Sequence, residues 1–201
     1  MDAQIIHDLV ALYREIDEKT ASLAEQTGLQ CPSGCGRCCE NPEVETTVLE
    51  VIPLALELWK RGEASQWLAK IEAVEARGAC VFYAPDPFIP ENGRCSVYQW
   101  RPSLCRLFAF ATVKNKHGEP ELAACVRHKQ TNPEAVNRAR MAIANGLSAA
   151  NFGEISARLA DLDPGLGTRL LPINQAMKEA LHRVGLIAQL LDDFGDGDRA
   201  A

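Results

Sequence analysis

The chain has 201 residues, of which 47% are hydrophobic and 24% are charged, a balance typical of a globular protein rather than of a disordered segment. A domain of this length buries a sizeable core without covalent cross-links, so its eight cysteines require another explanation. The net charge of −6 and the pI near 5.3 argue against a phosphate-backbone binder, and we expect no nucleic-acid partner.

The cysteine content and the N-terminal sequence both indicate a reducing compartment. Secreted disulfide scaffolds are short and usually exceed roughly 8–10% cysteine, whereas eight cysteines are spread here through 201 residues. The first residues lack the basic start and apolar run of a signal peptide, and no stretch is long and apolar enough to cross a bilayer. We therefore expect a cytoplasmic protein with no membrane partner, whose clustered thiols serve metals or catalysis.

The first predicted element is an amphipathic helix over residues 2–27. Its apolar residues recur at three- and four-residue spacing along one face: Ile5, Leu9, Leu12 and Ile16. Gly28 favours the left-handed turn that ends a helix. The next segment, residues 31–43, contains two glycines, two prolines and four cysteines, so we expect an irregular, knuckle-like loop.

A second helix is predicted after this loop. Thr47 and Glu50 match a capping box, and the apolar run that follows predicts a helix ending near Gly62. Residues 64–77 carry apolar side chains at helical spacing and precede Gly78, which predicts a third helix.

The middle of the chain has weaker periodicity. Between Cys80 and Cys95, prolines and a glycine favour turns and short extended pieces over a helix. The run Arg101-Pro102-Ser103 predicts a short helix that carries Cys105. The apolar residues 107–113 predict a strand.

Helices are predicted again near the C-terminus. Asn132-Pro133-Glu134 is a well-formed helix start, and Gly146 is a suitable end for that helix. Residues 148–160 are weakly helical, and Pro172 begins a segment with apolar residues at helical spacing. The acidic tail, residues 192–201, is expected to fray.

No repeat, low-complexity tract or linker divides the chain, so we expect a single domain over residues 1–201. Its predicted class is mainly α, with helices packed around an irregular, cysteine-rich metal-binding core and at most a short β element. The core spans about residues 31–125 and is flanked by the N-terminal helix 2–27 and the C-terminal helices 132–194. Because the core is largely loop, we expect the metal to replace hydrophobic contacts there.

The densest cysteine cluster has the spacing of a metal site. Thiolate sulfurs bind zinc and iron well, and Cys35 and Cys38 are separated by the two residues that let consecutive ligands converge on one ion. Cys31 supplies a third sulfur. Because Cys38 and Cys39 are adjacent, we expect one of them to join a second site, bridge two ions or make an outer contact. The simpler alternative for this cluster is a set of buried thiols without metal.

Four further cysteines complete an even set of candidate metal ligands: Cys80, Cys95, Cys105 and Cys125. Two four-thiolate sites, or a cubane iron–sulfur cluster plus a zinc ion, would use all eight. His128, three residues after Cys125, is a spare ligand candidate. Taken singly, Cys80 and Cys125 are as readily explained as small buried hydrophobic residues.

Two blocks of sequence resemble a known family. The first is Cys31…Cys35…Cys38-Cys39, and the second is Cys95-Ser-Val-Tyr98-Gln-Trp-Arg101-Pro102-Ser-Leu-Cys105-Arg106. Together they resemble the YkgJ-like cysteine-cluster family, also called the CxxCxxCC zinc- or iron-chelating domain, over about residues 31–125. The resemblance implies metal chelation. The flagellin lysine methylase looks similar through the same cysteine domain. One departure from the family name is that three residues, rather than two, separate Cys31 from Cys35.

Two arginines of the second block are candidate cofactor-binding residues. Arg101 and Arg106 would neutralise clustered thiolates and donate hydrogen bonds to sulfur. The alternative for each is an ordinary surface ion pair. Tyr98 and Trp100 are expected to pack over the site and exclude water.

The sequence therefore predicts a metal-binding protein that chelates an iron–sulfur cluster, such as a [4Fe–4S] cluster, and/or zinc. Because both metals take the same thiolate ligands, spacing leaves the choice between them open. The alternative is an iron–sulfur-dependent enzyme similar to flagellin lysine methylase. A thiol–disulfide protein without metal is a third alternative. No particular protein partner is indicated.

Overall fold

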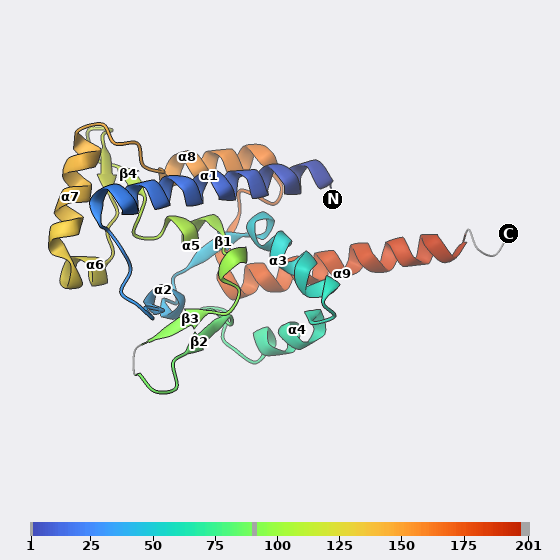
Figure 1. The fold of residues 1–201 in the computed structure, drawn as a ribbon. Coiled ribbons are helices and arrows are strands. Elements are labelled where there is room, and N and C mark those ends of the chain that lie inside the picture. The colour runs from blue at the N-terminus through green and yellow to red at the C-terminus, as the bar shows by residue number, and fades with distance from the viewer. Residues whose placement is uncertain (1, 90–91, 198–201) are drawn as a thin grey trace.

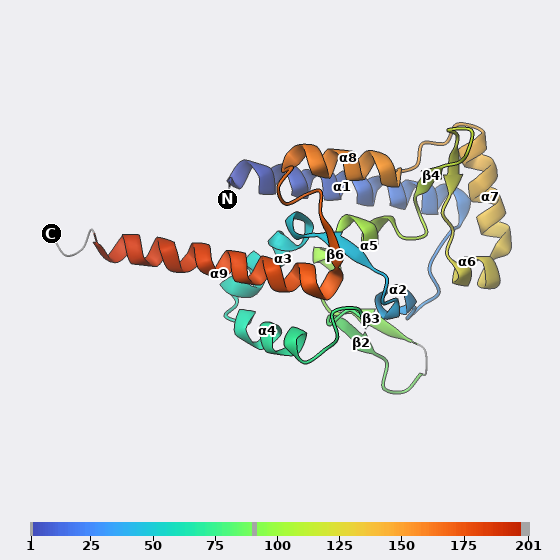
Figure 2. The same cartoon turned by 180° about the vertical axis from the view of Figure 1, so that it is seen from behind.

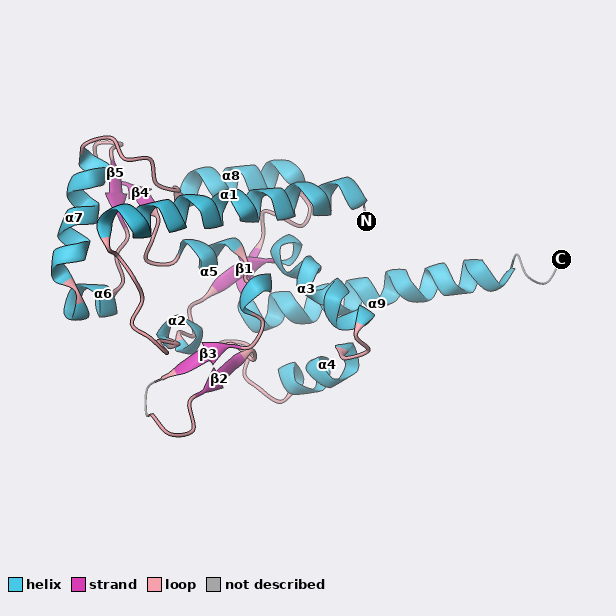
Figure 3. Ribbon diagram, viewed as in Figure 1, coloured by secondary structure: helices cyan, strands magenta, loops and turns pink. Residues whose placement is uncertain are grey.

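The computed structural model describes residues 2–89 and 92–197, with side chains described through residue 190 (Figure 1). Within this part of the chain, helices dominate and the named strands form short antiparallel pairs (Figure 3). This confirms the predicted mainly α class with a short β element.

Helices and short strands are distributed along the whole described chain. The helices are α1 (Ala3–Thr27), α2 (Arg37–Glu40), α3 (Val48–Lys60), α4 (Ala64–Glu72), α5 (Ser103–Leu107), α6 (Val126–Thr131), α7 (Pro133–Ala144), α8 (Phe152–Leu162) and α9 (Ile173–Gly197), with a 3₁₀ turn, η1, at Tyr98–Trp100. The strand pairs are β1 (Glu45–Thr47) with β6 (Leu170–Pro172), β2 (Tyr83–Pro85) with β3 (Gly93–Cys95), and β4 (Thr112–Lys114) with β5 (Pro120–Leu122).

The helices form two groups around the centre of the molecule. Helices α1 and α8 lie side by side, and α7 crosses near the C-terminal end of α1 (Figures 1 and 2). Helices α3 and α9 pack against each other, with α4 beside them. In Figure 1, α2 and the β2–β3 hairpin lie to the lower left of α3 and α9, with α4 to the right of the hairpin, and α9 extends well beyond its neighbours. No helix in the described ranges combines the length and apolarity that a bilayer crossing requires.

Three apolar clusters hold these groups together. One joins α1, α5 and α8, and a second joins the end of α1 to α7 and β5. The third lies between α3 and α9, with Val51, Leu54 and Met177 buried in it. Cys80 is buried in the third cluster, and partly buried cysteines pack against it. The cysteine-rich core is therefore continuous with an ordinary hydrophobic core.

Several local predictions of helix ends are confirmed. Helix α1 ends at Thr27, and Gly28 has the left-handed φ of 70°. Thr47 and Glu50 form both hydrogen bonds of a capping box at the start of α3. The Asn132 side chain accepts from the Ala135 N–H at the start of α7. These signals succeed because each depends on contacts within one helical turn.

The predicted strand over residues 107–113 is mostly wrong. Helix α5 continues to Leu107, and Ala109 has a positive φ of 71°, which breaks the extended backbone. The strand β4 therefore begins only at Thr112. The apolar run was misleading because Leu107 is buried in the core as part of a helix, and the turn at residues 108–110 separates it from Ala111, which is buried in the same core.

Three helix boundaries also differ from the predicted ones. Helix α4 ends at Glu72 rather than near residue 77. Helix α8 begins at Phe152, because the Asn151 side chain caps its first backbone N–H groups. Helix α9 continues through Gly197, so the fraying expected from residue 192 is wrong up to that point. The remainder of that expected tail, residues 198–201, lies outside the described residues.

Candidate metal centre

One cavity brings together six of the eight cysteines. They come from the segment around α2, from the turn before β2, from the end of β3 and from α5: Cys35, Cys38, Cys39, Cys80, Cys95 and Cys105. Apolar side chains of α3 and α9 complete the walls. The cavity has a volume of about 70 Å³, whereas one water needs roughly 10–15 Å³ on the same measure. Thiols distant in sequence therefore share one small enclosed space.

Close backbone contacts fix the segment that carries three of these cysteines. The Tyr83 ring lies against Gly36 and Gly93, where a Cβ atom would come within 2.3 Å of a ring carbon. Only glycine leaves room for this approach. The Gly93 N–H donates to the Gly34 carbonyl oxygen at 2.8 Å. The β2–β3 hairpin thus holds the start of α2, and α2 directs both Cys38 and Cys39 to the cavity.

The turn that carries Cys80 is fixed from two sides. Its backbone N–H donates to the Cys39 carbonyl oxygen at 2.8 Å. The buried Asn174 side chain of α9 accepts from the Val81 N–H at 2.9 Å and donates to the Ala79 carbonyl oxygen at 3.0 Å. Burial raises the pKa of Cys80 to about 12. This thiol is therefore placed at the cavity in its protonated form at neutral pH.

A buried carboxylate positions the helix that carries Cys105. Glu50, which is 3% exposed, accepts from the Ser103 N–H at 2.9 Å and from the Ser103 hydroxyl. Its other oxygen accepts from the Thr46 hydroxyl at 2.9 Å and from the Thr47 N–H and hydroxyl at 3.0 Å. Helix α5 has no side-chain cap of its own at Pro102. Glu50 therefore caps α5 from α3, a role that the sequence analysis missed.

Three of the cavity cysteines influence one another's titration. Interaction with the Cys39 side chain lowers the pKa of Cys38 and of Cys95, and interaction with these two thiols raises the pKa of Cys39. Because the three groups interact, they titrate together. The lowered pKa values favour the thiolate form of Cys38 and Cys95, which is the form that binds metals.

Arg101 places a positive charge at the wall of this cavity. Its guanidinium carbon lies 3.5 Å from the centre of the Tyr98 ring, and its Nη1 donates to the Cys105 carbonyl oxygen at 3.4 Å. Burial raises the pKa of Cys105, and the Arg101 charge opposes this rise. The same charge also lowers the pKa values of Cys38 and Cys95. Arg101 therefore places positive charge near these thiols, whereas its described hydrogen bonds go to the carbonyl oxygens of Tyr98 and Cys105 rather than to sulfur.

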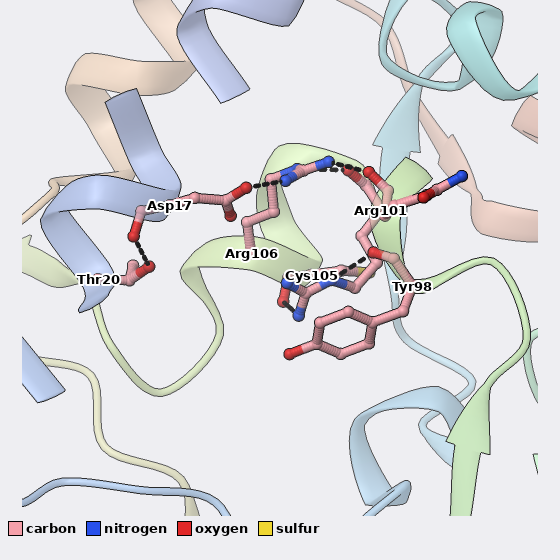
Figure 4. Close-up of polar contacts among 7 residues, drawn as sticks. Asp17, Thr20, Tyr98, Arg101, Cys105 and Arg106 are labelled. Carbon is pink, nitrogen blue, oxygen red and sulfur yellow. Dashed lines mark hydrogen bonds and ion pairs between the residues drawn. The ribbon is translucent and has the colours of Figure 1, made fainter. Parts of the chain in front are cut away.

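Arg106 has different surroundings. Its guanidinium donates to the Asp17 carboxylate of α1 and to the carbonyl oxygens of Gln99, at 2.6 Å, and Arg101, at 2.7 Å (Figure 4). It also lies over the Tyr13 ring at 4.5 Å. Arg106 does not line the cavity. Its contacts connect α1 to the backbone carbonyls of Gln99 and Arg101, so Arg106 helps to hold the segment that carries Arg101.

The remaining two cysteines lie outside the cavity lining. Cys31 is exposed, Cys125 is partly exposed, and neither contributes to the walls. Although Cys31 is exposed as a residue, desolvation by the surrounding protein atoms raises the pKa of its thiol to about 11, and the charges of Cys125, Cys35 and Cys38 add to this rise. Cys31 is therefore within electrostatic range of Cys125 and of the Cys35 end of the cavity.

His128, the spare ligand candidate, also lies away from the cavity. It is 1% exposed, and both of its ring nitrogens lack a hydrogen-bond partner. Its ring packs edge-on against Phe110 with centroids 5.4 Å apart. Its backbone N–H, rather than its ring, contacts the Cys125 sulfur at 3.3 Å.

We predict that His128 makes the fold sensitive to acid. Burial lowers the pKa of His128 below the ordinary value of 6.5. The unfolded chain therefore binds a proton more readily, and stability present above about pH 6.5 is lost as the pH falls towards the folded-state pKa. In His128→Leu, denaturant unfolding at pH 7.5 and 5.5 should show a smaller acid loss than in the wild type. Exposed His117→Leu is the control; equal acid losses in all three proteins would contradict this role.

The cavity cysteines are suitable ligands for a thiolate-bound metal, although they are not grouped closely enough to hold one as they stand. Soft thiolates select zinc and iron–sulfur centres over hard cations. Among the side chains described, those of residues 2–89 and 92–190, no three His, Cys, Asp or Glu are grouped so that they could hold an ion. The six cysteines instead line different walls of the cavity. Binding a metal would therefore include an inward movement of these side chains.

A mainly helical fold that surrounds a small cavity with six free thiols has the features of a cysteine-rich metal-chelating protein. The comparison with known families agrees. The model of the CxxCxxCC family, described as "Putative zinc- or iron-chelating domain", matches residues 30–137, more than half of the 201-residue chain. The chain belongs to this family, which confirms the resemblance seen in its cysteine blocks. No curated protein and no solved structure matches the chain.

Proposed function

We propose that the protein binds an iron–sulfur cluster, and/or zinc, through cysteines that line the cavity. The observation that carries this proposal is the presence of six thiols from four chain segments around one space of about 70 Å³. Free cysteines are often buried singly as small apolar residues, but this explanation does not account for six around one cavity. A cationic side chain, Arg101, lies at the same wall, where bound thiolates would need neutralising charge.

The size of the cavity favours a polynuclear centre. Zinc in a structural site takes four ligands, and a [4Fe–4S] cluster also takes four thiolates. Six lining cysteines exceed either requirement, so two would remain as neighbours or alternative ligands. A cluster occupies more space than one ion, and the cavity is several times the size that a single water needs. We therefore favour an iron–sulfur cluster over a lone zinc ion.

The free cysteines also bear on the location of the protein in the cell. All eight cysteines are free in the structure, and a set of thiolate ligands persists best where disulfides are kept reduced. We propose a cytoplasmic location and a metal centre as the principal partner. The net charge of −6 supports the further proposal that nucleic acid is not bound.

The proposal is tested by the composition of the full chain purified without oxygen. Iron and acid-labile sulfide in stoichiometric amounts, with a brown colour, would support the cluster. A colourless protein with stoichiometric zinc would support zinc chelation and reject the cluster. Folded protein with neither metal, in which all eight thiols react with a thiol reagent, would reject both forms of the proposal.

One observation favours the enzymatic alternative, a catalyst similar to flagellin lysine methylase. An open groove next to the cavity shares Cys95, Tyr98 and Trp100 with it as common walls. A substrate in this groove would lie next to the metal centre. The alternative requires a coordination position that a small molecule can reach. A change in the electron paramagnetic resonance spectrum of the reduced cluster on adding cyanide would support it, and an unchanged spectrum would count against it.

A further inference from the structure

Trp100 is a residue of the cavity wall with an unused hydrogen-bond donor. Its indole Nε1 is buried and has no hydrogen-bond partner. The other two tryptophans are both paired: Trp59 donates to the Leu181 carbonyl oxygen at 3.1 Å, and Trp67 donates to the Glu63 carboxylate at 3.2 Å. Buried indole N–H groups ordinarily find an acceptor. The unpaired N–H of Trp100 therefore indicates that its acceptor is supplied by something else.

Among the side chains that line the cavity with Trp100, almost the only hydrogen-bond acceptors are sulfurs. Among the described lining residues, the Tyr98 hydroxyl is the one side-chain oxygen, and Tyr98 is 62% exposed. The other lining side chains are cysteines, apolar residues and Arg101, which is itself a donor. The groove on the other side of Trp100 is open, yet Nε1 is shielded from solvent. Bulk water in the groove therefore does not contact the group.

We propose that the Trp100 indole N–H donates a hydrogen bond to a sulfur of the metal centre held in this cavity, and so tunes its electronic properties. The inference rests on the proposed metal-binding function. An N–H···S bond withdraws electron density from a thiolate or sulfide, and hydrogen bonds to sulfur are among the factors that set the properties of such centres. Trp100 is accordingly a positioning and tuning residue rather than a ligand.

The test uses cobalt(II) as the probe, because it binds thiolates and its thiolate-to-cobalt charge-transfer band reports on electron density at sulfur. Metal-free full-length protein is prepared without oxygen and titrated with cobalt(II). In Trp100→Phe, which removes the N–H and keeps an aromatic wall, the band should move to lower energy than in the wild type. Trp67→Phe is the matched control, since Trp67 lines the neighbouring groove but not the cavity, and its band should match that of the wild type.

A second replacement separates the hydrogen bond from packing. Benzothienylalanine at position 100 has nearly the shape of tryptophan and replaces the N–H with sulfur, so it should show the same shift as Trp100→Phe. A wild-type band in both position-100 proteins would overturn the inference and leave metal binding intact. Absence of any thiolate–cobalt band in the wild type would instead overturn the proposed function.

Discussion

Cys39→Ser is expected to lower the affinity for zinc or iron by more than about 100-fold. Replacing a group that merely orients a ligand already costs roughly 10–100-fold, and Cys39 lines the cavity together with Cys38 and Cys95, with which its thiol interacts. Serine keeps the size of the side chain but offers a hard oxygen in place of a soft sulfur. Competition with a chromogenic chelator, on protein prepared without oxygen, measures the change.

The matched control is the double variant Cys31→Ser/Cys125→Ser, in which two cysteines outside the cavity lining are changed in the same way. We expect it to bind within a few-fold of the wild type. Equal losses in the control and in Cys39→Ser would show that the centre involves all eight cysteines, as the sequence alone predicts. An unchanged affinity in Cys39→Ser would remove this residue from the centre.

Glu50→Gln is expected to lower the free energy of unfolding by about 2–4 kcal/mol, because an unsatisfied buried donor costs roughly 1–3 kcal/mol and hydrogen bonds to a charged group contribute roughly 1.5–3 kcal/mol. The Glu50 carboxylate accepts the backbone N–H groups of both Ser103 and Thr47. Glutamine has one carbonyl oxygen, so its NH₂ group must face one of these two donors. Equilibrium unfolding in urea measures the difference.

The control for Glu50 lies on the same helix. Glu57→Gln removes a partly exposed ion pair with Arg61, and such pairs contribute roughly 0–1 kcal/mol. Glu50→Gln should also weaken metal binding modestly, because Glu50 caps the helix that carries Cys105. If both variants unfold at the same urea concentration, Glu50 is not the connection between α3 and α5 that its hydrogen bonds suggest.

Local features of the fold were predictable from sequence, and features that depend on distant contacts were not. The end of α1 at Gly28 and the capping box at Thr47 each involve residues within one turn. The strand expected over residues 107–113 failed because the burial of Leu107 arises from packing with α1 and α8, which the periodicity of the segment does not reveal. The α9 end was misjudged because acidic and glycine residues lower helix propensity without determining the outcome.

In the candidate site, too, local features were predictable from the sequence and distant contacts were not. Short spacing predicted that the cysteines around α2 would lie near one another, and the family pattern linked them to Cys95 and Cys105. The two arginines of that pattern were indistinguishable in sequence. Asp17, which pairs with Arg106, comes from a helix 89 residues earlier, and only the fold reveals this partner.

The supporting residues of the site gave even weaker signals. Glu50 matched a capping box, which explained it completely at the level of sequence, whereas its bonds to Ser103 cross 53 residues. Asn174 lies near the start of a helix and gave no indication that it holds the turn around Cys80. Such residues are found only when hydrogen-bond partners are traced through the folded chain.

Alkylation of each cysteine, followed by mass spectrometry before and after chelation, examines most directly whether sulfurs from separate segments hold one inorganic centre. The account predicts that cysteines of the cavity are protected in the protein as purified and become reactive together when the metal is removed. Cys31 and Cys125 should react at similar rates in both states. If chelation leaves every rate unchanged, the thiols of the cavity hold no metal and the account is wrong.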